Sequence, residues 1–169
     1  MKLLSSFPPF ADDRSRILIL GTMPGPVALA RRQYYGFPGN HFWRILPEIL
    51  EAAAPRTYRE KIRLLKDRRI ALWDVIRTCT RTGASDSSIR SVLPNDIPGL
   101  LRRRRAIRTI FLNGRTAETL YRRHFGDVIR IPAYTLPSTS PAHASMSYEK
   151  KKKAWSAILP YLENRNEWC

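Results

Sequence analysis

Short apolar runs alternate along the chain with longer segments in which apolar residues recur every three or four positions. The short runs predict four buried strands, at 17–20, 70–75, 109–112 and 128–131, the last of which could continue to Leu136 in spite of Pro132. The amphipathic segments predict helices at 41–53, 58–67, 96–104, 116–124 and 148–164. Residues that commonly cap helices precede four of these segments: Asn40, Thr57, Asn95 and Ser147.

This alternation favours a parallel sheet covered on both faces, because parallel neighbours need a crossover connection, usually a helix. The predicted fold class is therefore α/β, a three-layer α/β/α sandwich with a short, mainly parallel four-stranded sheet. The segments 5–16, 78–88 and 132–145 lack periodicity, but we find neither a repeat nor a domain linker. We expect one domain over 1–169, with enough apolar residues, 43% of the chain, for a packed core.

The composition argues against several classes of protein. The longest apolar stretches fall well short of the ~20 residues of a membrane span, and the first ten residues do not resemble a secretory signal. Two cysteines, Cys79 and Cys169, are too few for a zinc or iron–sulfur site, and no histidine has the spacing of a metal ligand. We expect no membrane partner, no metal or other cofactor, and a reducing, cytoplasmic compartment.

Charge points to the partner. The chain has 30 Lys and Arg residues against 14 Asp and Glu, which gives a net charge of +16. A polyanion is implied, and nucleic acid fits best because arginine suits phosphate oxygens and the aromatic residues can stack on bases. The alternative is a protein that is basic in general, from a high-GC or salt-adapted background.

The residues that follow each predicted strand are candidates for chemistry, because ligands of such folds bind at the carboxyl ends of the strands. Gly21-Thr-Met-Pro-Gly25 follows the first strand, and an aromatic, glycine-containing block at 33–43 comes after it. The later strands are followed by Asp74, by Asn113-Gly114 and by the block 136–143. We interpret Asn113 and Gly114 as structural. The turn is a weak signal by itself, whereas the aromatic block is informative.

Five blocks in this order resemble the uracil-DNA glycosylase superfamily, and within it the hypoxanthine-DNA (deoxyinosine) glycosylase branch. The resemblance extends over nearly the whole chain. It rests on Leu18-Ile-Leu-Gly-Thr-Met-Pro-Gly25, Gln33-Tyr-Tyr with Pro38-Gly-Asn-His-Phe-Trp43, Ala71-Leu-Trp-Asp-Val75, Asn113-Gly114 and Leu136-Pro-Ser-Thr-Ser-Pro-Ala142. Met23 stands where the mismatch-specific branch carries a catalytic asparagine, and Leu136 replaces the histidine of the uracil enzymes. The resemblance implies a uracil-DNA glycosylase-like sandwich.

In the hypoxanthine branch the catalytic asparagine lies in the aromatic block, which corresponds to Asn40 here. An amide can orient the attacking water and accept a hydrogen bond, but it is a weaker base than a carboxylate, so we expect a modest catalyst. The alternative for Asn40 is helix capping, because it directly precedes a helical pattern. The two roles could coexist.

A flipped base must be held by stacking and by contacts to its Watson–Crick edge. The resemblance places Thr22, Met23, Tyr35 and Asp74 at the base, with Tyr35 stacking on it. An ionised Asp74, favoured by nearby arginines such as Arg77, would accept a hydrogen bond from hypoxanthine N1–H and repel the bare N1 of adenine. The alternatives are a core aromatic for Tyr35, and for Asp74 a strand-end residue that pairs with Arg77 or caps a turn.

The block that begins at Leu136 is expected to hold the DNA backbone through hydroxyls and backbone N–H groups. Its candidate DNA-binding residues are Pro137, Ser138, Thr139, Ser140 and His143. The alternative is a polar connection to the last helix. The basic runs 102–105 and 150–153 are assigned to general attraction of DNA.

These observations predict a monofunctional DNA repair glycosylase that excises hypoxanthine and leaves an abasic site. No lysine stands in a motif as a Schiff-base nucleophile, which fits a monofunctional enzyme. Alternatives are excision of uracil or of a mismatched base, and a non-catalytic nucleic-acid-binding protein on the same fold. We expect a monomer that acts on DNA with deaminated bases, in association with the nucleoid of a prokaryotic cell.

Overall fold

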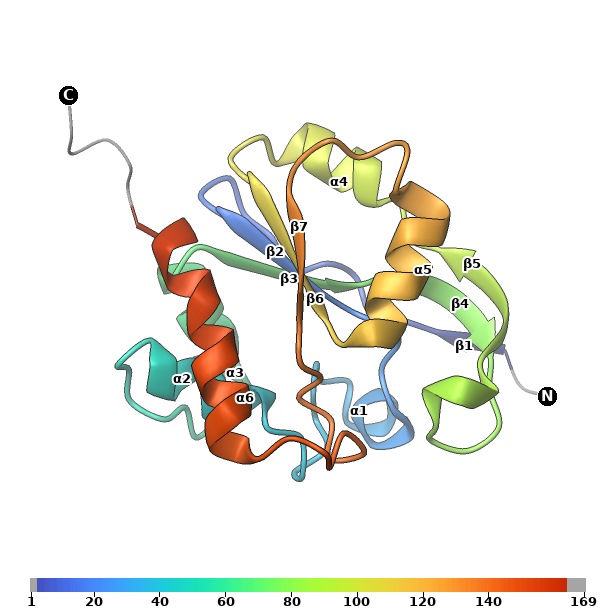
Figure 1. The fold of residues 1–169 in the computed structure, drawn as a ribbon, viewed down its shortest axis with the longest axis horizontal. Helices are drawn as coiled ribbons and strands as arrows, with labels where there is room; N and C mark the ends of the chain where they lie inside the picture. Colours follow the sequence, from blue (N-terminus) through green and yellow to red (C-terminus); the bar gives the residue numbers. More distant parts are fainter. Residues whose placement is uncertain (1–2, 164–169) are drawn as a thin grey trace.

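The computed structural model describes residues 3–163, and four parallel strands form its centre (Figure 1). They are β2 (Ile17–Gly21), β3 (Ile70–Asp74), β6 (Thr109–Asn113) and β7 (Ala133–Leu136), in the spatial order β3-β2-β6-β7. Every residue of β2, β3 and β6 is buried, as expected of a parallel sheet covered on both faces. The predicted α/β class with a four-stranded sheet is confirmed.

The register of the sheet brings the ends of the strands to one edge. Gly21 pairs with Asp74, and Asn113 pairs with Leu136. The residues that follow the strands therefore meet at this carboxyl edge, although they lie far apart in the sequence.

Helices cover both faces of the sheet. The chain forms α1 (Pro26–Arg31), α2 (Phe42–Ile49), α3 (Tyr58–Asp67), α4 (Ile97–Arg103), α5 (Arg115–Phe125) and α6 (Tyr148–Trp155), followed by a 3-10 helix at Ser156–Tyr161. In Figure 1, α2, α3 and α6 lie on one side of the sheet, and α4 and α5 lie on the other. No helix within residues 3–163 is long and apolar enough to span a membrane.

A second, antiparallel sheet was not predicted. It consists of β1 (Leu3–Ser5), β4 (Ile76–Thr80) and β5 (Arg90–Pro94), in the order β1-β4-β5, with a 3-10 turn at Asp86–Ser88 between the last two. The pairing of β4 with β5 shifts register twice. Such irregularities interrupt the alternation of apolar and polar residues, which explains why the segment 78–88 has no readable period.

The last strand was predicted too early. Residues 128–131 are not a strand, because the amides of Val128 and Ile129 both donate to the Phe125 carbonyl at 3.0 Å and close the end of α5. The strand is β7, which begins after Pro132 and ends at Leu136, the extension considered from the sequence.

Two helices are shorter than predicted. The helix expected at 41–53 ends at Ile49, and Glu51 then takes a left-handed conformation with φ of 50°. The helix expected at 148–164 changes to a 3-10 helix at Ser156, and residue 164 lies outside the described residues.

The predicted caps were tested by the hydrogen bonds at the helix starts. Thr57 and Ser147 cap α3 and α6 through their side chains, as predicted. The prediction that Asn95 caps α4 was wrong, because Asp96 caps this helix by accepting from Gly99 N at 2.9 Å. The side-chain Nδ2 of Asn95 instead donates to the carbonyls of Asp74 and Ile76, at 2.8 and 3.1 Å, and so links the end of β5 to the end of β3.

Candidate active site

Asn113, the last residue of β6, joins the loops that meet at the carboxyl edge. Its Nδ2 donates to Tyr35 Oη and to Thr139 Oγ1, both at 3.0 Å, and its Oδ1 accepts from Thr139 N at 3.0 Å. The Thr139 carbonyl accepts in turn from His41 N at 3.0 Å. The sequence interpretation of Asn113 as a structural strand end missed these contacts to two of the candidate motifs. The available signal was a polar residue at the end of an otherwise apolar strand.

Asn40 is partly exposed and lies one residue before His41, the N-cap residue of α2. Its Oδ1 accepts from Phe42 N at 2.9 Å, and its own N–H donates to the Phe37 carbonyl at 3.0 Å. The Asn40 side chain thus satisfies the backbone N–H of the first helical residue, but the N-cap position predicted for Asn40 is occupied by His41, whose side chain makes no cap bond. This bond uses one of the two lone pairs of Oδ1 and leaves the other for a water molecule, so capping and water binding are compatible.

Tyr35 packs between α2 and the end of β2. Its ring stacks on Phe42 with centroids 4.1 Å apart and planes inclined by 19°, so a base would have to stack on the opposite face. The backbone of Tyr35 is left-handed, with φ of 52°. The absence of a side chain at Gly21 makes room for Tyr35 and Asp74, because a Cβ there would lie 3.0 Å from Tyr35 Oη and 2.5 Å from Asp74 Oδ1.

Asp74 is the last residue of β3 and is only 4% exposed. Among the described residues, its Oδ2 has no hydrogen-bond partner. Burial raises the pKa of Asp74 to about 7, and the negative charge of Asp86 adds to the shift. The expectation that Arg77 keeps Asp74 ionised was wrong, because Arg77 lies exposed on β4 and burial dominates.

The first motif is held against the segment between β4 and β5. Thr22 and Met23 are buried, and the Thr22 side chain hydrogen-bonds to Asp86. Burial raises the pKa of Asp86, while this bond and the charge of Arg81 lower it. Arg81 is itself buried and donates from Nη2 to the Pro24 carbonyl at 2.8 Å. Sequence reasoning gave Arg81 and Asp86 no role because their segment shows no pattern.

The loop after β7 divides into inward and outward parts. Thr139 is fully buried, and its amide, hydroxyl and carbonyl all bond within the protein. The structure therefore gives Thr139 the task of holding the loop, in place of the expected direct contact with DNA. Ser138, Ser140 and His143 are partly exposed, and the two serine hydroxyls accept from amides two residues further on, at 3.2 Å.

Side chains of α6 support the same loop from behind. Trp155 Nε1 donates to the Pro137 carbonyl at 2.9 Å. Lys151, only 1% exposed, donates from Nζ to the Ser140 carbonyl at 3.1 Å, and burial lowers the pKa of its ammonium group. Lys151 was assigned with the basic run 150–153 to general attraction of DNA, so its buried, inward orientation is a correction.

Two surface cavities are formed mainly by other residues, although Leu136 and Pro137 at the carboxyl edge help to line the second. The cavities, of about 550 and 340 Å³, are lined by residues that include Phe7 and Tyr58 in one and Phe111 and Tyr134 in the other, and neither lining includes Asn40 or Asp74. Within residues 3–163 no cluster of three His, Cys, Asp or Glu residues could hold a metal ion.

Comparisons with known proteins agree on one family. The model of the uracil DNA glycosylase superfamily matches residues 8–163. A hypoxanthine DNA glycosylase from Methanosarcina acetivorans is 35% identical over 157 residues, which cover 90% of this chain and 96% of that protein. One from Methanosarcina barkeri is 32% identical over 154 residues, which cover 89% and 94%. The solution NMR structure of a candidate uracil DNA glycosylase from Methanosarcina acetivorans superposes with a TM-score of 0.80 at 35% identity, covering 96% of this chain and all of that one.

Proposed function

The chain belongs to the uracil DNA glycosylase superfamily, and from this premise we propose that it hydrolyses the N-glycosidic bond of a flipped hypoxanthine in DNA and leaves an abasic site. The observation that carries the choice of base is the Asp74 carboxyl group, which is buried at the carboxyl edge with Oδ2 unpartnered among the described residues. A buried acceptor without a partner is costly, and a base that brings an N–H group to it removes that cost.

Hypoxanthine offers Asp74 an N1–H donor beside the O6 acceptor. The carboxylate accepts from N1–H, and the neutral acid can also donate to O6 while its other oxygen accepts from N1–H. Adenine has a bare N1, which the carboxylate repels but to which the neutral acid can donate. Because the pKa of Asp74 is raised to about 7, both forms are populated at neutral pH, and discrimination against adenine belongs to the ionised form.

Asn40 would position the attacking water. The bond from Phe42 N fixes the plane of its amide, so the remaining lone pair of Oδ1 has a defined direction before substrate binds. An amide does not take up the proton of the water, so its contribution is orientation of the nucleophile toward an oxocarbenium-like sugar. Tyr35, fixed by Phe42 and Asn113, would stack on the base, and the loop that contains Ser138, Ser140 and His143 would hold the DNA backbone.

The first test measures single-turnover release of bases from duplexes that carry hypoxanthine, xanthine, uracil or a G·T mismatch. We expect hypoxanthine to be released fastest, and strand scission only after alkali. Asn40→Ala should lower this rate by about 10² or more, since orientation of the nucleophile is lost.

The control for Asn40→Ala is Thr57→Ala, which removes the side-chain cap of α3. Either change should cost about 1 kcal/mol of stability. Equal loss of activity in both variants, in proportion to unfolding, would reduce Asn40 to a cap. Faster release of uracil than of hypoxanthine would favour the uracil alternative, and DNA binding without any release would favour the non-catalytic one.

A further inference from the structure

Lys151 is a buried lysine on α6, behind the loop after β7. It belongs to the run of four lysines at 150–153, in which Lys150 and Lys153 are exposed whereas Lys151 is only 1% exposed. It shares a face of the helix with Trp155, four residues further on, which is buried as well. The run is uniform in sequence, so the burial of this one ammonium group is a consequence of the tertiary fold.

The charge of Lys151 has no partner of opposite sign within residues 3–163. Lys152 pairs with Glu48 and with Glu149, each at 3.1 Å, whereas Lys151 makes no ion pair with a described residue. Its Nζ donates to the Ser140 carbonyl, a neutral group, at 3.1 Å. Burial lowers the pKa of Lys151, because the charged form loses hydration. An anion that approaches from outside would therefore offset a cost that the free protein already carries.

The loop after β7 turns carbonyl groups toward the interior of the protein. Three of them accept hydrogen bonds there: Pro137 from Trp155 Nε1 at 2.9 Å, Thr139 from His41 N at 3.0 Å and Ser140 from Lys151 Nζ at 3.1 Å. Carbonyl oxygens carry partial negative charge and repel phosphate, so these bonds keep them away from the outer side of the loop. Of the three donors, only Lys151 brings a full positive charge.

We propose that Lys151 is a positioning residue for DNA, whose buried positive charge acts through the loop and is balanced by the phosphate group that the loop holds on its outer side. This inference rests on the proposed function, because it presupposes that the loop containing Ser138 and Ser140 binds the DNA backbone. Salt screens a buried charge much less than an exposed one, and the effective dielectric constant of the intervening loop is lower than that of water. The phosphate in turn favours the charged form of Lys151.

The first experiment separates the charge of Lys151 from its packing. Lys151→Met keeps an unbranched chain, and the Ser140 carbonyl keeps a partner because it also accepts from His143 N at 3.1 Å. We expect the thermal unfolding midpoint of Lys151→Met to equal or exceed that of the wild type, because an unpaired buried charge is removed. Its affinity for an undamaged duplex should nevertheless fall by about tenfold. Loss of affinity in proportion to loss of stability would make Lys151 a structural residue and overturn the inference.

Two matched variants control for the hydrogen bond and for net charge. Lys151→Gln removes the charge but can still donate to the Ser140 carbonyl, so it should bind as weakly as Lys151→Met. Lys66→Met removes one exposed charge near the end of α3 and should leave the affinity within about twofold of the wild type. Wild-type affinity of Lys151→Gln would show that the hydrogen bond suffices, and an equal loss in Lys66→Met would reflect net charge alone. Either result would overturn the inference.

The second experiment identifies the phosphate. Hypoxanthine duplexes carry one uncharged methylphosphonate linkage, placed in turn at each position within about three nucleotides of the lesion. At one position the substitution should slow single-turnover excision below saturation by about tenfold in the wild type and by less than about twofold in Lys151→Met, because both changes remove the same interaction. The rate at saturation should differ by less than about twofold between the two proteins, since Lys151 does not touch the reacting atoms. Equal losses in both proteins at every position would contradict the inference.

These measurements also separate the inference from the proposed function. If the wild type releases no hypoxanthine, but Lys151→Met and Lys151→Gln bind the undamaged duplex about tenfold more weakly, the proposed function fails and the inference stands. If hypoxanthine is released and both variants bind DNA as tightly as the wild type, the inference alone fails.

Discussion

A single carboxyl group at the end of β3 carries much of the expected selectivity. Gly21 lies directly behind Asp74, and a methyl group at that position would meet Oδ1 at 2.5 Å. The carboxyl group is thereby enclosed without a cation at hydrogen-bonding distance among the described residues. Burial and the neighbouring charge of Asp86 both favour the neutral form, which is why the pKa of Asp74 is raised.

This raised pKa predicts a pH-dependent stability difference between the wild type and Asp74→Asn. The folded protein holds the Asp74 proton more tightly than the unfolded chain, so the group stabilises the fold below pH ~4 and loses that contribution as pH rises to about 7. A change in pKa from 3.8 to about 7 corresponds to a free energy on the order of 4 kcal/mol. Between these pH values we expect the unfolding free energy of the wild type to fall relative to that of Asp74→Asn. Above pH ~7 the difference between the two should stay constant, as measured by denaturant unfolding at several pH values.

Excision supplies the second readout for Asp74→Asn. In the wild type, the ratio of hypoxanthine to adenine release should rise as Asp74 ionises through pH ~7, whereas the variant should show a low ratio without this rise. Uracil should gain relative to hypoxanthine in the variant, because an amide can both accept from N3–H and donate to O4. Equal slowing on every base would assign Asp74 to the fold or to the water, and unchanged rates would place it outside the base pocket.

Three segments at the carboxyl edge are held in their relative positions by a few hydrogen bonds. The segment between β2 and α2 carries Tyr35 and His41, the end of β6 carries Asn113, and the loop after β7 carries Thr139. Hydrogen bonds of 3.0 Å link these segments through Asn113 and Thr139. The relative position of the candidate base-stacking and DNA-binding groups is thus set by side chains that need not touch the substrate.

Asn113→Ala should loosen both outer segments together. The change leaves buried polar groups of Thr139 without partners, which should cost about 1–3 kcal/mol of stability. We expect faster hydrogen exchange at the His41 amide, although His41 does not bond to Asn113 directly, and a loss of excision at temperatures where the variant is folded.

Asn113→Asp is the conservative comparison, since its carboxylate can still accept from Thr139 N while Tyr35 Oη can donate to it. In Asn113→Asp the His41 amide should therefore stay better protected from hydrogen exchange than in Asn113→Ala. An effect of Asn113→Ala confined to Thr139 would show that the segments are held independently.

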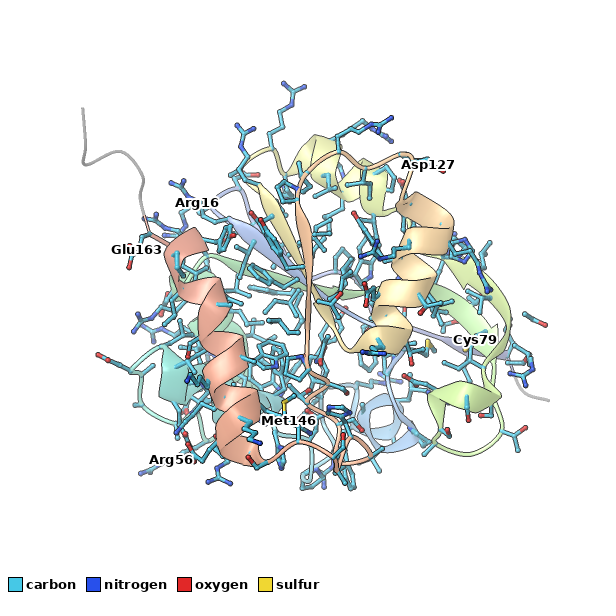
Figure 2. The ribbon with its side chains drawn as sticks, in the orientation of Figure 1. Arg16, Arg56, Cys79, Asp127, Met146 and Glu163 are labelled. Carbon is cyan, nitrogen blue, oxygen red and sulfur yellow. The ribbon has the colours of Figure 1, made fainter. Side chains whose placement is uncertain are left out.

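The whole molecule has a strong positive charge that is not confined to one element. Figure 2 shows side chains with nitrogen-rich ends around much of the periphery, with Arg16 at the upper left and Arg56 at the lower left. The net charge of +16 therefore indicates a polyanion without locating its site. We expect the DNA to bind at the carboxyl edge of the central sheet, so only the basic residues near that edge should contact phosphate.

This difference predicts how individual arginines affect binding to an undamaged duplex. Affinity should fall steeply between about 50 and 200 mM salt, because each phosphate contact releases counterions. Arg115, exposed at the start of α5 directly after β6, lies at the carboxyl edge, and Arg115→Gln should reduce the slope of log affinity against log salt by about one.

Arg102→Gln is the matched control, because Arg102 is exposed near the end of α4, toward the amino end of β6. Its slope should equal that of the wild type. A flat salt dependence of the wild type would contradict a role of the charge in DNA binding, and equal effects of the two variants would mean that DNA contacts are spread over both edges.

The sequence by itself determined three of the four strands of the central sheet, β2, β3 and β6, and the residues that meet at its carboxyl edge. Strands such as Ile17–Gly21 and Ile70–Asp74 are buried on both faces, so their continuous apolar runs are visible without any partner in view. Thr57 and Ser147 were equally readable as caps, because a cap bonds to an amide three residues away. The family resemblance rested on the same kind of local information, namely short blocks and their order.

Only the tertiary structure decided what surrounds each of those residues. Thr139 and Lys151 read as polar surface residues, yet contacts with segments distant in sequence bury both. The neutral tendency of Asp74 follows from its enclosure by Gly21 and Tyr35 and from the charge of Asp86, none of which neighbours it in the chain. The irregular sheet formed by β1, β4 and β5 had no period to read. Local pattern fixes the type of element because backbone hydrogen bonding and side-chain direction repeat over a few residues, whereas burial and charge environment depend on long-range packing.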